Sequence, residues 1–165
     1  PVEQRGPLLA LLEAHPPAST PAVDREEVIE KLARQLNQLT YEQRREVRIS
    51  RKLDGFFREL TPEEQTKFLD LTLPTGFKQM MEALNKMTPE KRKRFVNKTL
   101  EDMKRQEAEY GSGEDVQEER RNLDANGQKI IDQGFRSFYG EASAETKMDV
   151  APLIEQLQKN LQGVR

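Results

Sequence analysis

One short pattern occurs three times in the middle of the chain and is typical of the start of a helix. The copies begin at residues 39, 60 and 87 and read Leu-Thr-Tyr-Glu-Gln-Arg, Leu-Thr-Pro-Glu-Glu-Gln and Met-Thr-Pro-Glu-Lys-Arg. Each Thr can accept a hydrogen bond from an unpaired N–H of the first turn, and Pro at the first helical position loses no helical hydrogen bond. Gln43 and Glu64 follow their Thr by three residues, which predicts a capping box in the first two copies. The pattern therefore predicts a series of closely spaced helices.

Helical periodicity continues on both sides of these copies. Hydrophobic residues make up 35% of the chain and charged residues 34%, so each helix contributes one apolar stripe to a lean core. We predict an all-α fold, an irregular bundle of about six to seven amphipathic helices with repeated Thr-Pro-Glu helix starts. The first expected helix covers 24–37 and is opened by an Asp24–Glu27 capping box with a Val23–Val28 hydrophobic staple. The next expected helices cover 41–60, 62–73, 77–87, 89–110 and 116–138, and the last begins at Ser143. Pro74 is expected to end the helix over 62–73. Asn126-Gly127 is either a turn or lies within its helix.

The first 23 residues form a separate segment. Residues 16–21 read Pro-Pro-Ala-Ser-Thr-Pro, which predicts an extended linker. We therefore divide the chain into a Pro-rich N-terminal arm and linker, 1–23, and a helical domain, 24–165. The arm either packs on its own domain, which is the simpler interpretation, or on a partner subunit. The second alternative predicts a homodimer through Leu8, Leu9, Leu11 and Leu12.

The residue types needed for catalysis or metal binding do not gather in this sequence. There is no Cys, which excludes disulfides, thiolate catalysis and Cys-ligated metal centres. The one His, His15, lies beside the predicted linker. The sequence has no Gly-rich phosphate loop, no Ser nucleophile elbow and no Glu-x-x-His pair. We predict that the protein is not an enzyme and has no cofactor, no metal ion and no small-molecule substrate.

Charge is segregated along the chain. Residues 86–98 carry six basic residues against one acidic residue, and residues 101–119 carry eight acidic residues against two basic ones. The run 91–94 lies at a helix start, where the helix dipole disfavours cations. The net charge of −2 and the lack of interleaved aromatics argue against nucleic acid. An acidic protein partner or a membrane surface fits better, while a solvated face is the simpler interpretation. The basic candidates for partner binding are Arg44, Arg48, Arg51, Lys91, Arg92, Lys93 and Arg94. Met80 and Met81 are further candidates, and they belong either to the core or to an adaptable apolar binding surface.

Residues 39–43 resemble a known signature. Leu39-Thr40-Tyr41-Glu42-Gln43 is similar to the Leu-Thr-x-x-Gln motif of the LTxxQ-motif helical periplasmic proteins (Spy/CpxP-like), and residues 60–65 are a near match. This resemblance implies a dimeric helical cradle that holds unfolded clients in the bacterial periplasm. The repeated apolar-x-Pro-Glu-Glu helix start is also similar to helical-repeat domains of magnesium-transporter regulatory regions and flagellar switch proteins. That second resemblance implies a cytoplasmic scaffold.

We therefore predict a non-enzymatic protein-interaction domain, the soluble part of a bacterial envelope protein with a chaperone-like or scaffold role. A periplasmic or membrane-anchored location is favoured over the cytoplasm. The chain starts at Pro1 rather than Met, and a signal peptide or membrane anchor upstream of Pro1 would favour the envelope. A cytoplasmic helical-repeat scaffold or regulatory domain, and a basic-patch nucleic-acid binder, are the alternatives.

Overall fold

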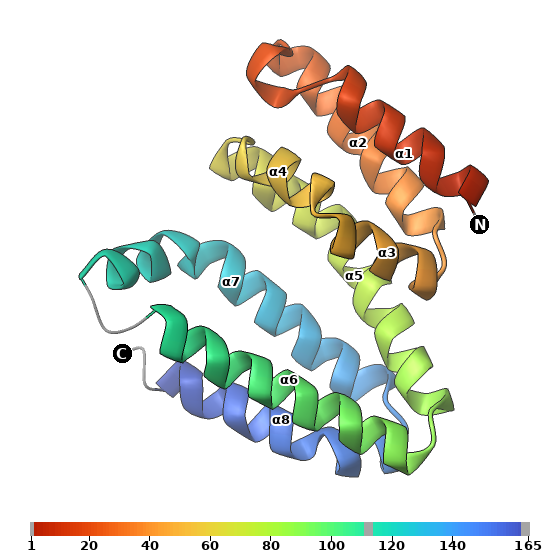
Figure 1. Ribbon diagram of the computed structural model, residues 1–165, viewed down its shortest axis with the longest axis vertical. Helices are drawn as coiled ribbons and strands as arrows, with labels where there is room; N and C mark the ends of the chain where they lie inside the picture. Colours follow the sequence, from red (N-terminus) through yellow and green to blue (C-terminus); the bar gives the residue numbers. More distant parts are fainter. Residues whose placement is uncertain (1, 111–113, 163–165) are drawn as a thin grey trace. The chain divides into compact units, whose positions relative to one another are not determined.

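The chain is all-α, as the periodicity predicts. A computed structural model describes the backbone of residues 2–110 and 114–162, and the side chains of residues 6–48, 50–105 and 126–160. This described part has eight α-helices, one 3₁₀-helix and no strand (Figure 1). The elements are α1 (Val2–Ala14), η1 (Pro17–Ser19), α2 (Ala22–Gln38), α3 (Tyr41–Ser50), α4 (Lys52–Arg58), α5 (Pro62–Lys86), α6 (Pro89–Tyr110), α7 (Glu114–Glu141) and α8 (Ala144–Gln162).

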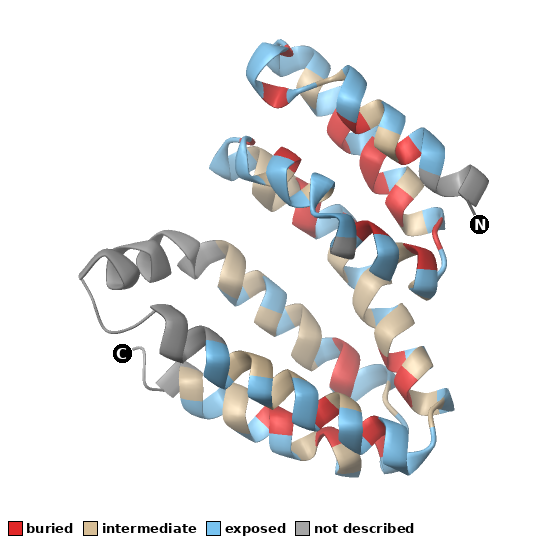
Figure 2. Ribbon diagram, in the orientation of Figure 1, coloured by how far each residue is buried: buried red, intermediate tan, exposed pale blue. Residues whose placement is uncertain are grey.

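The chain forms two compact units, Pro1–Gln79 and Met80–Arg165. This division differs from the predicted one at residue 23, because the N-terminal arm belongs to the core of the first unit. Figure 2 shows buried residues where α1 meets α2 and, separately, where α6 meets α8. The first core contains Leu8, Leu12, Val28, Ile29, Leu32, Ala33, Leu36, Leu39, Val47, Phe56, Leu60 and Phe68. The second contains Met81, Leu84, Val96, Phe138, Val150, Leu153 and Ile154.

The three predicted helix caps are confirmed. Thr40 Oγ1 accepts from Gln43 N at 3.2 Å, and Gln43 Oε1 accepts from Thr40 N at 2.9 Å, which is a complete capping box. Thr61 and Glu64 make the same pair of bonds, at 3.2 and 3.0 Å. Thr88 Oγ1 accepts from the backbone N–H three residues later at 3.3 Å. The sequence pattern therefore sets the starts of α3, α5 and α6.

The start of α2 is not the predicted one. The helix begins at Ala22, and its first backbone bond runs from Arg25 N to Pro21 O at 2.8 Å. Asp24 lies inside the first turn instead of capping it, and no side chain caps this end. Val23 is 81% exposed, so the predicted staple with Val28 is absent. Pro21 is the residue before the helix and has φ of −59°, a value that the proline ring fixes. The helix begins after it without a side-chain cap.

The predicted helix over 41–60 is broken in two at Arg51. This residue has φ of 61°, in the left-handed region, and separates α3 from α4. Arg51 is neither Gly nor Asn, the residues that adopt this conformation at least cost. Neither Gly nor Pro marks the break in the sequence, so residue type gave no sign of it.

The expected helix end at Pro74 is wrong, because α5 continues through it. Proline removes one N–H donor and crowds the preceding turn of its helix. In that turn, Leu71 O accepts from Asn37 Nδ2 and Thr72 O accepts from Arg44 Nη2, both at 2.9 Å. Side chains from α2 and α3 thus donate to carbonyls of the turn beside the proline, and the predicted helices 62–73 and 77–87 are one helix.

In the second unit, α6 and α8 run in the same direction and α7 runs opposite to both (Figure 1). Asn126 and Gly127 lie within α7, which settles the open alternative. The α8 helix starts after Ser143, whose Oγ accepts from Thr146 N at 3.1 Å. Residues 111–113, between the expected helices 89–110 and 116–138, fall outside the described residues.

Candidate interaction surface

Arg92 is an internal residue of the second unit, although it is one of the predicted partner-binding residues. Its side chain is fully enclosed, with the residue only 1% exposed. Its Nε lies 2.9 Å from Asp149 Oδ2, and its Nη1 donates to two carbonyls at the end of α5, Leu84 O at 3.2 Å and Met87 O at 2.7 Å. A carboxylate and two carbonyls thus compensate the buried charge. Arg92 joins the end of α5 to α8 and is not available to a partner.

Arg44, another predicted partner-binding residue, is also engaged inside its own unit. Its Nη2 donates to Asn37 Oδ1 at 3.3 Å as well as to Thr72 O, and its Nη1 to Gln79 Oε1 at 3.5 Å. These acceptors are neutral oxygens. Burial, with a smaller effect from nearby Arg48, lowers the pKa of Arg44 to about 10. Arg44 is still charged at neutral pH, and its charge stabilises contacts between α2, α3 and α5.

The two inward arginines occupy the same place in the repeated pattern, four residues after the capping Thr. The equivalent residue of the second copy, Gln65, donates from Nε2 to Phe57 O at 3.0 Å. In the second and third copies this residue therefore donates to carbonyls near the end of the preceding helix, in addition to the backbone N–H groups that Phe57 O and Leu84 O already accept. The sequence carried a signal for this role, because Arg92 precedes the buried Val96 by four residues and so lies on the apolar side of α6.

The two methionines belong to the core of the second unit. Met81 is buried there and Met80 packs against the same cluster. Of the two interpretations that the sequence allows for them, the structure supports the core.

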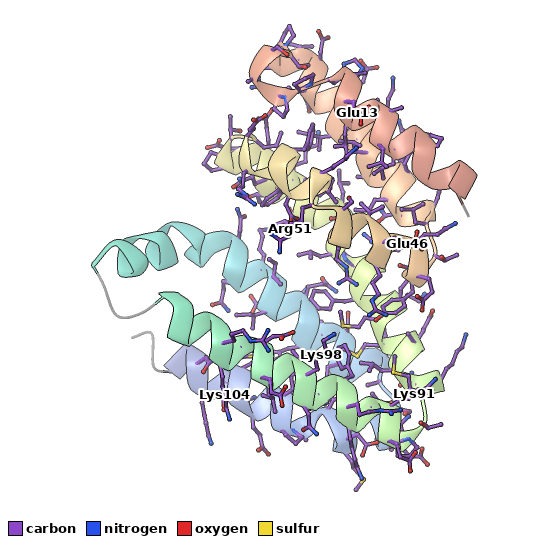
Figure 3. All side chains as sticks on the ribbon, viewed as in Figure 1. Glu13, Glu46, Arg51, Lys91, Lys98 and Lys104 are labelled. Atoms are coloured by element: carbon purple, nitrogen blue, oxygen red, sulfur yellow. The ribbon has the colours of Figure 1, made fainter. Side chains whose placement is uncertain are left out.

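The other predicted basic residues are exposed. Lys91, Arg94 and Lys98 follow one another at intervals of three and four residues, so they share one face of α6. Figure 3 labels Lys91 and Lys98 on this helix. None of the three forms an ion pair with a carboxylate among the described side chains. We call these three residues the α6 basic face. Lys93 is exposed on the same helix, and Arg48 and Arg51 are exposed in the first unit.

A polar cluster that the sequence interpretation missed holds the linker. Arg25 Nη1 donates to Thr20 O at 2.8 Å and to Pro17 O at 3.5 Å. Arg25 Nε donates to Glu64 at 3.0 and 3.3 Å, and Glu64 also closes the capping box of α5. Burial alone raises the pKa of Glu64, but the hydrogen bonds from Thr61 and Arg25 outweigh it and lower the pKa from its usual 4.5. Glu64 is therefore ionised at neutral pH and holds the arginine in place.

The leucines of the arm pack against α2 and α4 of the same chain. Leu8 and Leu12 are buried in the first core, and Leu9 and Leu11 are partly buried against it. The simpler interpretation of the arm therefore describes this structure. The homodimer stays a prediction. The leucines of the arm no longer support it, because they pack against their own chain.

Two further observations concern metal binding and membrane crossing. No group of three His, Asp or Glu among the described residues is arranged to hold a metal ion. In the described part of the chain, none of the helices combines the length and apolar character needed to cross a membrane.

The chain matches no protein-family model, no curated protein and no solved structure at the level that would establish a relationship.

Proposed function

We propose that this chain is a non-enzymatic protein-interaction domain that binds an acidic protein partner through the α6 basic face. The observation that carries the proposal is the contrast between Arg92 and its neighbours. Arg92 has two carbonyl acceptors and a carboxylate at 2.9 Å. The α6 basic face is exposed and has no ion-pair partner among the described side chains.

The position of these cations strengthens the proposal. Lys91 lies in the first turn of α6, where the partial positive charge of the helix N-terminus opposes it, and Arg94 follows in the second turn. Glu90 is the one acidic residue of that first turn. Carboxylates on a partner would relieve this repulsion and pair with three residues that already lie on one face.

A scaffold role fits the described surface better than a client-holding role. A holdase presents a contiguous apolar patch to its clients. The exposed large hydrophobic residues here lie on four different helices, and the two that share α7 are nine residues apart, on opposite sides of it. They are Val23, Leu71, Ile130, Tyr139 and Met148. The resemblance of residues 39–43 to periplasmic LTxxQ proteins favours an envelope scaffold, periplasmic or membrane-anchored, over a cytoplasmic one.

Binding to a fluorescein-labelled, glutamate-rich peptide tests the proposal. R94E/K98E should weaken binding roughly tenfold at about 0.15 M salt, since it reverses two of the three charges on the face. R136E/K159E changes the net charge equally at exposed residues of α7 and α8 and should leave the affinity close to that of the wild type. Equal losses in the two variants would show that only net charge matters, and the α6 basic face would be abandoned as a site.

The nucleic-acid alternative is decided by the same assay. We expect negligible binding to duplex DNA at about 0.15 M salt, because the net charge is −2. DNA binding that is tighter than peptide binding, and that falls steeply with salt, would replace the protein partner with a nucleic acid.

A further inference from the structure

We propose that α1 is an exchangeable helix, and that the face of α2 and α4 beneath it takes α1 of a second copy of the chain when the linker turn opens. This interaction surface lies in the first unit and is independent of the α6 basic face. The inference begins with the kind of contacts that α1 makes.

The contacts of α1 are mainly apolar and carry no feature that restricts them to one chain. Leu8 is completely buried and Leu12 nearly so, among residues of α2 and α4 such as Ile29 and Phe56. One ion pair accompanies them, between Lys52 Nζ and Glu13 Oε1 at 3.0 Å, and both side chains are about half exposed or more. A leucine helix in an apolar groove is a common mode of recognition between separate chains.

A second copy is the occupant that fits this face, because its α1 presents the same leucines and the same Glu13. Exchange of identical elements reproduces every contact of the closed chain, which makes it a low-cost route to a dimer. The closed and exchanged forms therefore differ mainly in the path of residues 15–21.

The closed path depends on a compact turn. Thr20 Oγ1 donates to Pro16 O at 2.7 Å, and Ser19 N donates to the same carbonyl at 3.2 Å. On either side of η1 the prolines are extended, Pro16 with ψ of 132° and Pro21 with ψ of 150°. Without the turn, this proline-rich linker favours an extended conformation, which directs α1 away from its own unit.

Arg25 holds this turn closed. It reaches the carbonyls at both ends of η1, Pro17 O and Thr20 O, while Glu64 holds its Nε. The bond to Pro17 O requires the closed path, because residues 17 and 25 are brought together only by the turn. Arg25 and Thr20 thus stabilise the closed form relative to the exchanged form. We call the bonds of these two residues to the linker carbonyls the linker clamp.

The Lys52–Glu13 ion pair gives a direct readout of exchange. Unlabelled and ¹⁵N-labelled full-length chains are mixed in equal amounts, incubated and treated with a carbodiimide, which joins ion-paired Lys and Glu. Mass spectrometry of the 13–52 cross-linked peptide then separates pairs within one chain from pairs that contain both isotopes. We expect mixed-isotope pairs to be scarce in the wild type.

Opening the linker clamp should raise the mixed share. We expect R25A and T20V each to increase it about tenfold, in proportion to the lost hydrogen bonds, and dilution to reverse the increase. K67A is the matched control. Lys67 also joins α5 to α2, through Glu26 and Glu30 at 2.8 and 3.0 Å, but it does not touch the linker, so its mixed share should equal that of the wild type.

Three results would overturn the proposal. The first is a mixed share in both R25A and T20V that is no higher than in K67A. The second is a wild-type share already at the statistical level, since α1 would then exchange with the linker clamp in place. The third is the absence of the 13–52 cross-link from the wild type, because the proposal begins from that contact.

Discussion

Arg44 lies against the backbone of Gly76, so close that a Cβ atom at residue 76 would stand 3.3 Å from Cζ of the guanidinium. The glycine thus makes room for the cation that bonds to the turn before Pro74. Gly55, also in a helix of the first unit, has no such neighbour within 4 Å of a Cβ atom. The two glycines provide a matched comparison.

Gly55→Ala should stabilise the protein by about 1 kcal/mol, because alanine has the higher helix propensity and the space is open. Gly76→Ala should gain clearly less, since its methyl group crowds Arg44. Urea denaturation of both variants measures the difference. An equal gain in both would mean that Arg44 moves aside without cost.

Thr61→Ala should cost about 1 kcal/mol of stability, the usual loss when an N-cap is removed. The hydroxyl accepts from Glu64 N at 3.2 Å, which satisfies one N–H of the first turn of α5. Thr66→Ala is the control, because its hydroxyl donates back to Pro62 O within the helix, a bond that contributes little. Denaturation midpoints that coincide for the two variants would argue against a cap at Thr61.

Arg92→Met should destabilise the protein by about 3–5 kcal/mol, since it leaves Asp149 without its buried partner. Lys91→Met removes an exposed charge from the same turn and should change stability by less than about 0.5 kcal/mol. Thermal unfolding followed by circular dichroism compares the two. A mild effect of Arg92→Met would show that its hydrogen bonds contribute little net stability.

Glu64 should make folding sensitive to acid. Its pKa is lower in the folded chain than the usual 4.5, so its contribution is fully present above the unfolded value and is lost as pH falls through the folded value. Between neutral pH and about 3, wild-type stability should therefore fall more than that of Glu64→Gln, which has no charge to lose. Parallel pH profiles for the two proteins would contradict the lowered pKa.

Arg51→Gly should stabilise the junction of α3 and α4 by roughly 1 kcal/mol, because φ of 61° is costly for a residue with a Cβ atom. Arg48→Gly, in the regular part of α3, should instead destabilise by about 1 kcal/mol. Chemical denaturation gives both values. If the two substitutions have the same sign, Arg51 is not under backbone strain.

Sequence reasoning located the starts of α3, α5 and α6 because their caps are local. Thr40, Thr61 and Thr88 each bond to a backbone N–H only three residues away, and such bonds follow from residue type and spacing. The all-α class followed from the same regularity. The basic residues of α6 were found as well, and their exposure separates the α6 basic face from Arg92.

The remaining features depend on residues far apart in the sequence. Asn37 and Arg44 donate to the turn before Pro74, and they precede their acceptors by 34 and 28 residues. Arg92 is internal because Asp149, 57 residues later, comes to lie beside it. Helix propensity depends on local sequence and does not reflect such distant partners. The helix end predicted at Pro74 and the surface role predicted for Arg92 were therefore both wrong.

The proline within α5 has a consequence for the order in which the chain folds. Residues 62–86 hold a continuous helix alone only at a cost, because Pro74 removes one helical donor and crowds the preceding turn, and side chains of α2 and α3 donate to carbonyls of that turn. We therefore expect residues 75–79 to become helical only after residues 22–50 have assembled. In pulsed hydrogen exchange, amides just beyond the proline should gain protection later than those of residues 65–70. Simultaneous protection on both sides would mean that α5 forms without that support.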